Sequence, residues 1–223
     1  MTNLIFMLTH HDVTIPNALD VLEEVKATKL RFIGCKDIGL PMDKLIILFG
    51  KMKKAGMTTF LEVVSASEEQ HFSGVDKAVK VGADFLIGGM PAFTARTVKY
   101  LNDKKNRPKF FPYIGRVKDH PCILEGTVEQ IIENGKESEK KGIDGINLLL
   151  YRYTGNIHVL FERAVQELSV PLIVAGSIDN FEKMDQQRKK GIWAFTIGGA
   201  IFEKKFAPEK GIKEQVEAVL KYL

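Results

Sequence analysis

The sequence of 223 residues predicts an α/β protein in which eight parallel strands close into a barrel with helices outside. Three observations lead to this prediction. Strand and helix patterns alternate eight times along the chain. Helices end at glycine before the next strand at four repeated junctions, which are Lys54-Ala-Gly-Met57, Val81-Gly-Ala-Asp84, Lys141-Gly-Ile-Asp144 and Lys190-Gly-Ile-Trp193. The length is close to the roughly 250 residues typical of a (β/α)8 TIM barrel. We therefore expect one such domain over residues 1–223.

The strands are predicted from short apolar runs rich in β-branched and aromatic residues. In chain order they cover residues 4–9, 30–35, 58–64, 84–88, 109–114, 145–150, 171–176 and 193–198. The helices are predicted between them, where apolar residues recur with a helical period. They cover residues 16–28, 42–55, 70–81, 91–104, 125–141, 155–168, 179–190 and 208–222. Strands that alternate with helices over short connections form a parallel sheet, and eight such units are enough to close it.

The last two strands each break at glycine where they leave the sheet, in Val174-Ala-Gly-Ser-Ile178 and in Thr196-Ile-Gly-Gly-Ala-Ile201. In a barrel, the loops after strands 7 and 8 often bind phosphate through backbone N–H groups and a short helix N-terminus. Glycine lets the backbone approach the phosphate oxygens, because it has no side chain. The two loops therefore predict a phosphorylated small-molecule ligand.

These two loops, with the barrel pattern over nearly the whole chain, resemble the ribulose-phosphate-binding barrel superfamily. That superfamily includes sugar-phosphate epimerases and decarboxylases, and the phosphate-binding barrels of histidine and tryptophan biosynthesis. The resemblance implies that Gly176, Ser177, Gly198 and Gly199 bind the substrate phosphate. Two signatures depart from the pattern. The D-x-K-x-x-D motif of the decarboxylase branch does not follow strand 3, and the strand-1 and strand-5 aspartates of the histidine-pathway isomerase are not evident. The resemblance therefore points to the superfamily and to no characterised family.

Composition agrees with a large core and a mild charge. Hydrophobic residues make up 45% of the chain, and 32 basic residues are dispersed among 28 acidic ones, for a net charge of +4. No basic stripe indicates nucleic acid. The two cysteines, Cys35 and Cys122, lie far apart without CxxC spacing, which argues against a disulfide framework or a thiolate zinc site.

The opening segment, residues 1–8, has no basic flank and is too short to span a membrane. We therefore expect a cytoplasmic protein that binds no cofactor, no nucleic acid and no membrane. Its exposed barrel helices favour a homodimer.

Catalytic residues of a barrel lie at the C-terminal ends of its strands. Glu62 is the most informative carboxylate there. In Thr58-Thr-Phe-Leu-Glu-Val-Val64 the period of two places Glu62 on the same face as Phe60. A carboxylate on the outer face would lie under helices at a high cost, so we expect Glu62 to point into the barrel mouth as a general acid or base. The alternative is a structural ion pair at the rim.

Lys36 and Asp37 end strand 2 and are further candidates for catalytic residues. The lysine could act as a fixed charge, as a proton donor or as a Schiff-base nucleophile. Because adjacent residues of a strand point in opposite directions, both reach the site only if the chain has already turned. A solvated pair in a loop is the alternative.

His10, His11 and Asp12 follow strand 1. His10 is a candidate acid–base residue. In the alternative, one histidine forms hydrogen bonds with backbone groups, and Asp12 or Thr14 caps the next helix. A metal site is not expected. The other histidines, His71, His120 and His158, do not lie at strand ends.

Arg116, Asn147 and Arg152 are candidates for substrate binding after strands 5 and 6. Guanidinium groups at a barrel mouth can bind a carboxylate or phosphate, and Asn147 faces inward if Leu148 and Leu150 pack outward. In the alternative interpretation, the two arginines are solvated on the surface and Asn147 is a buried structural amide. The longer loop at residues 117–124 could be a lid or an oligomer contact.

Together these features predict an isomerase, an epimerase or a carbon–carbon lyase acting on a sugar phosphate or a related metabolite. In this hypothesis Glu62 moves a proton, and Lys36 stabilises an enolate or reacts with a carbonyl. The alternative is a non-catalytic barrel that binds a phosphorylated ligand as a sensor or regulator, since a fold by itself does not fix function.

Overall fold

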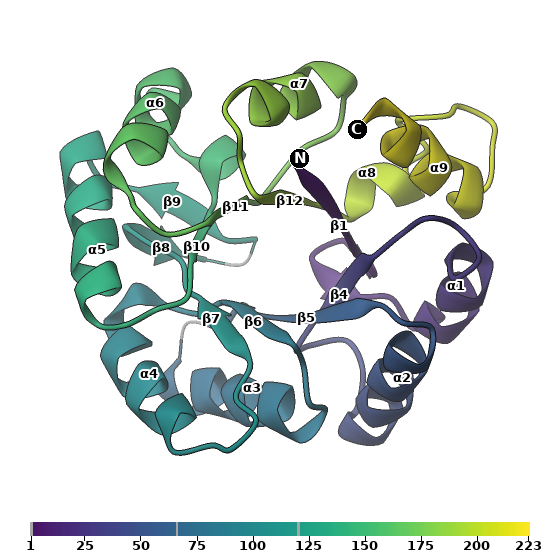
Figure 1. Cartoon of the computed structure of the whole chain (residues 1–223), viewed down its shortest axis with the longest axis horizontal. Coiled ribbons are helices and arrows are strands. Elements are labelled where there is room, and N and C mark those ends of the chain that lie inside the picture. Colours follow the sequence, from purple (N-terminus) through teal and green to yellow (C-terminus); the bar gives the residue numbers. More distant parts are fainter. Residues whose placement is uncertain (1, 66, 120) are drawn as a thin grey trace.

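The computed structural model describes residues 2–65, 67–119 and 121–223. It contains an eight-stranded parallel sheet that curls into a barrel, with helices outside it (Figure 1). In chain order its strands are β1 (Asn3–Met7), β4 (Phe32–Lys36), β5 (Thr58–Val63), β6 (Phe85–Gly88), β7 (Lys109–Phe111), β10 (Ile146–Leu148), β11 (Leu172–Val174) and β12 (Ala194–Ile197). Because β12 returns to pair with β1, the predicted (β/α)8 barrel is confirmed.

The barrel closes between β7 and β10 through a short seam. Asp144 N donates to Phe110 O at 3.0 Å, and Asn147 N donates to Pro112 O at 2.9 Å. The Asp144 carboxylate accepts from Phe110 N at 2.8 Å and from the Arg107 guanidinium at 2.6 Å. One side chain therefore joins the two strands where the ladder of backbone hydrogen bonds is shortest.

The helices surround the barrel as expected, with bounds that differ by a few residues from those predicted (Figure 1). The predicted helix at 91–104 begins as a 3₁₀ turn, η1 (Pro91–Phe93), and β10 is followed by another 3₁₀ turn, η2 (Leu150–Arg152). A one-turn helix, α8 (Gly199–Phe202), follows β12. The longer helices are α1 (Ala18–Val25), α2 (Met42–Lys54), α3 (Glu68–Lys80), α4 (Thr94–Asn102), α5 (Val128–Lys140), α6 (Ile157–Glu167), α7 (Phe181–Lys189) and α9 (Ile212–Tyr222).

Two antiparallel hairpins were not predicted from the sequence. The chain after β1 folds into β2 (Thr9–His10) and β3 (Val13–Thr14), and the loop after β7 contains β8 (Arg116–Lys118) and β9 (Ile123–Glu125). The second hairpin occupies the predicted long loop at 117–124, in which His120 lies outside the described residues. Both hairpins stand at the C-terminal end of the barrel, so they shape its mouth.

Aromatic side chains fill the interior of the barrel below its mouth. Phe60 stacks on Phe85 with centroids 4.5 Å apart, and Trp193 lies 5.3 Å from Phe85 and 5.4 Å from Phe111. Gly34 is required beside this cluster, because a Cβ there would lie 2.7 Å from Phe60 O. This packing confines open space to the C-terminal end of the barrel.

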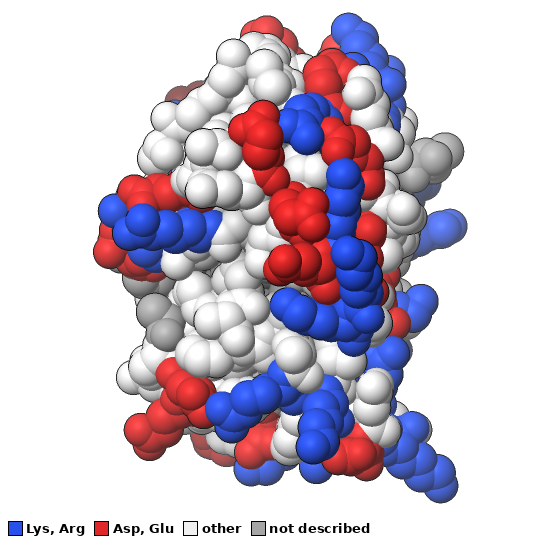
Figure 2. Space-filling view, turned by 90° about the vertical axis from the view of Figure 1, so that its left-hand side faces the viewer, with Lys and Arg blue, Asp and Glu red and all other residues white. Residues whose placement is uncertain are grey.

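The face on the left of Figure 1 carries intermixed charges, as Figure 2 shows. Lys and Arg side chains lie there next to Asp and Glu, with uncharged areas between the charged groups. Among the helices of the described residues, none has the length and apolar character needed to cross a bilayer.

Candidate functional site

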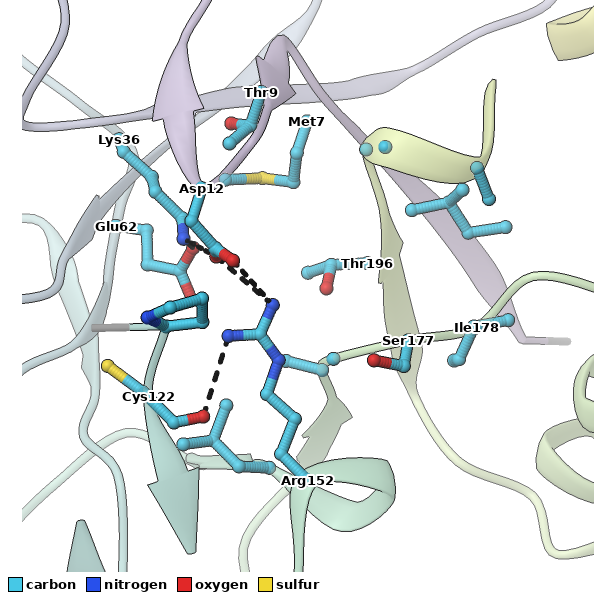
Figure 3. Close-up of a pocket in the computed structure, with 18 of the residues that line it drawn as sticks. Met7, Thr9, Asp12, Lys36, Glu62, Cys122, Arg152, Ser177, Ile178 and Thr196 are labelled. Atoms are coloured by element: carbon cyan, nitrogen blue, oxygen red, sulfur yellow. Dashed lines mark hydrogen bonds and ion pairs between the residues drawn. The ribbon is translucent and has the colours of Figure 1, made fainter. Parts of the chain in front are cut away.

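A cavity of about 500 Å³ opens at the C-terminal end of the barrel. One wall carries charged side chains from the β2–β3 hairpin, β4 and β5, and the opposite wall carries the loops after β11 and β12 (Figure 3). Arg152 of η2 extends between the two walls, beside Gly176. Its lining includes Asp12, Lys36, Glu62, Arg152, Gly176, Ser177, Thr196, Gly198 and Gly199. The structure thus gathers most of the predicted site residues in one place.

Asp12 reaches across the mouth from a tight turn. His11 and Asp12 form the two-residue loop of the β2–β3 hairpin, and both have positive φ, at 48° and 60°. This is the backbone of a type I′ turn, which aspartate tolerates better than most residues. Lys36 Nζ donates to Asp12 Oδ1, and Arg152 Nη2 lies 3.0 and 3.1 Å from the two carboxylate oxygens (Figure 3).

Electrostatics keep the Asp12 carboxylate ionised. Burial raises its pKa, but the charges and hydrogen bonds of Lys36 and Arg152 outweigh burial and bring the pKa below its usual value. The ionised Asp12 carboxylate therefore forms ion pairs with both Lys36 and Arg152.

Glu62 points into the barrel from β5, as the period of two predicts, and divides its two oxygens between different partners. Oε1 accepts from Tyr113 OH at 2.8 Å and lies 3.4 Å from Asn147 Nδ2, whereas Oε2 lies 4.0 Å from Lys36 Nζ. Burial and then the charge of Glu62 raise the pKa of Tyr113 well above its usual value, so its hydroxyl stays a donor. Oε2 is consequently the oxygen available to a ligand.

In the loops after β11 and β12, glycine is favoured at each position for a different physical reason. Gly176 has φ of 85°, and a Cβ there would lie 2.9 Å from Arg152 Cγ. At Gly198 a Cβ would lie 2.8 Å from Thr9 O. Gly199 begins α8 and has more room, since the nearest atom to a Cβ there is Glu203 Oε1 at 3.7 Å. A side chain at position 176 or 198 would thus clash with Arg152 or with the Thr9 carbonyl. At Gly199 the missing side chain leaves space in the cavity.

Ser177 follows Gly176 with a positive φ of 55°, which is uncommon for a residue other than glycine. Its carbonyl accepts from Lys183 Nζ at 2.7 Å. Consecutive residues in unusual conformations are typical of loops that present backbone N–H groups to an anion.

Four predicted site residues do not line the cavity: Asp37, Arg116, His10 and Asn147. Asn147 faces inward but is fully buried beside Glu62. Asp37 continues the alternation of β4 and therefore points outward, where its Oδ1 lies 3.4 Å from Val64 N and burial raises its pKa to about 6. Arg116 lies on β8 with a side chain that is 76% exposed, beside Glu125. Asp37 fails to reach the mouth because the chain does not turn before residue 37, and Arg116 because the β8–β9 hairpin carries it outward. Neither residue can therefore contact a ligand in this cavity.

His10 lies behind the rim, and His11 rather than His10 lines the cavity. The His10 ring packs against the His11 ring with centroids 3.8 Å apart and planes tilted by 33°, and its Nε2 lies 3.9 Å from Glu203 Oε1. Within the described ranges, no three His, Cys, Asp or Glu residues lie close enough together to hold a metal ion.

Sequence reasoning did not assign roles to Tyr113 and Cys122, which both line the cavity. Tyr113 lies two residues after Phe111, so the period of two could have placed it inside the barrel. Burial and the charge of Glu62 raise the pKa of Cys122 to about 11, so this residue is a neutral thiol. No pattern in the sequence indicates that Cys122 reaches the cavity.

No protein-family model and no curated protein sequence matches this chain. Solved structures do match its fold. The N-acetylmannosamine-6-phosphate 2-epimerase from Clostridium perfringens is 16% identical, with a TM-score of 0.65 over 98% of this chain and 92% of that one. The YdjI aldolase from Escherichia coli K12 is 14% identical, with a TM-score of 0.66 over 99% and 90%. The phosphoribosylanthranilate isomerase from Thermotoga maritima is 11% identical, with a TM-score of 0.64 over 100% and 98%. These likenesses show the TIM-barrel fold.

Proposed function

We propose that this protein is a phosphate-binding barrel enzyme, an isomerase, epimerase or carbon–carbon lyase that acts on a sugar phosphate or a related phosphorylated metabolite. The observation that carries the proposal is the meeting of Glu62 and Lys36 in one cavity with the two glycine loops (Figure 3). Three structural neighbours, an epimerase, an aldolase and an isomerase, support this class of reaction by analogy.

The roles follow from the two walls. Backbone N–H groups of Gly176, Ser177, Gly198 and Gly199 hold the phosphate at one wall, and the rest of the substrate extends toward the charged wall. There Glu62 Oε2 removes or returns a proton beside a carbonyl, and Lys36 stabilises the negative charge that develops on the carbonyl oxygen. Aldose–ketose isomerisation, epimerisation beside a carbonyl and retro-aldol cleavage all pass through such an enolate.

The phosphate site is tested by Gly199→Asp, with binding of inorganic phosphate measured by calorimetry. We expect binding to be abolished, because the new side chain fills the site and repels the anion. Gly50→Asp is the matched control, because it adds the same charge on the exposed surface of α2, where a Cβ meets no atom within 4 Å. Undiminished phosphate affinity in Gly199→Asp would remove the phosphate site from the proposal.

Catalysis is tested by turnover of a panel of aldose and ketose phosphates by the wild-type protein. Turnover of one of them supports the enzyme. Tight binding throughout the panel without turnover would instead favour the sensor or regulatory barrel.

A further inference from the structure

Four charged side chains meet in the cavity: Asp12, Lys36 and Glu62 lie across it from the loop after β12, and Arg152 reaches them from beside Gly176. We call Asp12, Lys36, Glu62 and Arg152 the charge tetrad. We infer from it that the end of the substrate far from the phosphate is uncharged, so the protein accepts phosphorylated sugars with a hydroxyl or carbonyl at that end and rejects the corresponding sugar acids. The inference rests on the proposed function and specifies its substrate class.

The tetrad is neutral and already paired. Two carboxylates face two cations, and their side chains are 14% (Asp12), 8% (Lys36), 8% (Glu62) and 22% (Arg152) exposed. Both cations contact Asp12, and Lys36 also lies 4.0 Å from Glu62 Oε2. Of the described residues that line the cavity, Lys36 and Arg152 are the only Lys or Arg. An entering carboxylate would therefore find no unpaired Lys or Arg on the lining, and the two carboxylates of the tetrad would repel it, with Asp179 and Glu203 elsewhere on the lining.

The hairpin fixes Asp12 in this position. Thr14 Oγ1 donates to Lys36 O at 2.8 Å and accepts from Lys36 N at 2.9 Å, and Thr14 N donates to Ile38 O at 3.1 Å. Asp12 thus lies two residues before Thr14, which is hydrogen-bonded to the end of β4 and to the loop after it. A substrate carboxylate has to displace Asp12 from both cations against this anchoring.

An uncharged group suits the same wall. A hydroxyl both donates and accepts, so it can donate to Glu62 Oε2 and accept from an N–H of the lysine or guanidinium. Arg152 has five N–H groups and Lys36 three, which leaves donors beyond those that contact Asp12. The tetrad can therefore bind hydroxyl and carbonyl oxygens without giving up its ion pairs.

Matched pairs of phosphate esters test the inference. Erythritol 4-phosphate, ribitol 5-phosphate and glucitol 6-phosphate are compared with 4-phosphoerythronate, 5-phosphoribonate and 6-phosphogluconate, by calorimetry at fixed salt. Within a pair only the far end differs, as CH₂OH or a carboxylate. For the length that fits, we expect the polyol to bind the wild-type protein about tenfold or more tightly than the acid, because one unfavourable charge contact costs at least about 1.4 kcal/mol.

Asp12→Asn should change this ratio. The amide keeps the shape, asparagine tolerates the positive φ, and the tetrad gains one net positive charge. We expect the preference to move toward the acid by about tenfold or more. Asp179→Asn is the control, because it removes a carboxylate that lines the cavity beside Ser177, so both esters should tighten equally.

The outcomes separate the inference from the proposed function. An acid that binds the wild-type protein as tightly as its polyol, or an unchanged ratio in Asp12→Asn, overturns the inference while the phosphate site stands. Failure of inorganic phosphate and of all six esters to bind overturns the proposed function itself.

Discussion

At the scale of single residues, Glu62 is held by one oxygen and offers the other to the cavity. Glu62→Gln keeps an oxygen for Tyr113 and Asn147 but removes the titrating group. We expect turnover to fall by about 10²–10⁴. Affinity for inorganic phosphate should change little, because the proposed phosphate loops lie on the other wall. Wild-type turnover together with a lower melting temperature would instead identify Glu62 as a structural residue.

Lys36 contacts Asp12, and this ion pair favours the lysine as a fixed charge over a nucleophile. An ammonium group that donates to a carboxylate has no free electron pair for attack on a carbonyl. We expect borohydride, added with the substrate that the panel identifies, to leave no covalent adduct on Lys36, as judged by mass spectrometry. An adduct at this residue would place the protein among Schiff-base aldolases.

Asp37 predicts a pH dependence of stability. Burial raises its pKa from 3.8 to about 6, so between these values the folded state binds more protons than the unfolded state. Its contribution to stability is therefore complete below pH 3.8 and is lost as the pH rises through 6. Asp37→Asn removes this loss, which amounts to at most about 3 kcal/mol. We expect the variant to gain stability over the wild type as the pH rises from 4 to 7, measured by urea unfolding, whereas a constant difference contradicts the assignment.

At the scale of elements, the β2–β3 hairpin places Asp12, and Gly39 gives the hairpin its room. Gly39 has φ of 98°, and a Cβ there would lie 2.7 Å from Thr14 N. Gly39→Ala should destabilise the fold by about 1–3 kcal/mol and weaken polyol phosphate binding, since β3 has to move. Gly142→Ala is the control, because Gly142 also has positive φ, at 85°, but a Cβ there meets no atom within 4 Å. Equal losses of ligand affinity in the two variants would show that the hairpin does not position the site.

The repeated helix-to-strand junctions gain a physical explanation from the structure. In Gly-Ala-Asp84 the aspartate accepts from Thr59 N at 2.8 Å, and in Gly-Ile-Asp144 it accepts from Phe110 N at 2.8 Å. Each aspartate lies one or two residues before its barrel strand and accepts a hydrogen bond from the neighbouring barrel strand, β5 or β7. At these two of the four junctions, the repeat therefore encodes a contact between neighbouring barrel strands.

At the scale of the whole molecule, Asp144 holds the seam between β7 and β10. Asp144→Ala leaves Phe110 N without the carboxylate and Arg107 without its ion pair, which should cost about 2–3 kcal/mol. We expect faster amide hydrogen exchange at residues 109–112 and 144–147, while the paired strands β4 and β5 stay protected. Asp84→Ala is the control, because it removes the same kind of contact where β5 and β6 are already paired over four residues. Uniformly faster exchange in both variants would contradict a special role for the seam.

The sequence by itself determined the number, kind and order of the barrel strands. It also determined the inward direction of Glu62 and the glycine loops after the last two barrel strands. These features follow from backbone periodicity and from glycine conformations, which depend on residues close together in the chain.

Only the tertiary structure decided which side chains meet at the mouth. Asp12 and Arg152 are brought together by closure of the ring and by a two-residue turn, and neither depends on local periodicity. The positions of Asp37 and Arg116 were also decided only by the tertiary structure. Asp37 points outward because β4 keeps its alternation up to this residue, and Arg116 points outward because it lies on the β8–β9 hairpin. Contacts across a barrel depend on how all eight strands are staggered, and the sequence near any one residue does not contain that information.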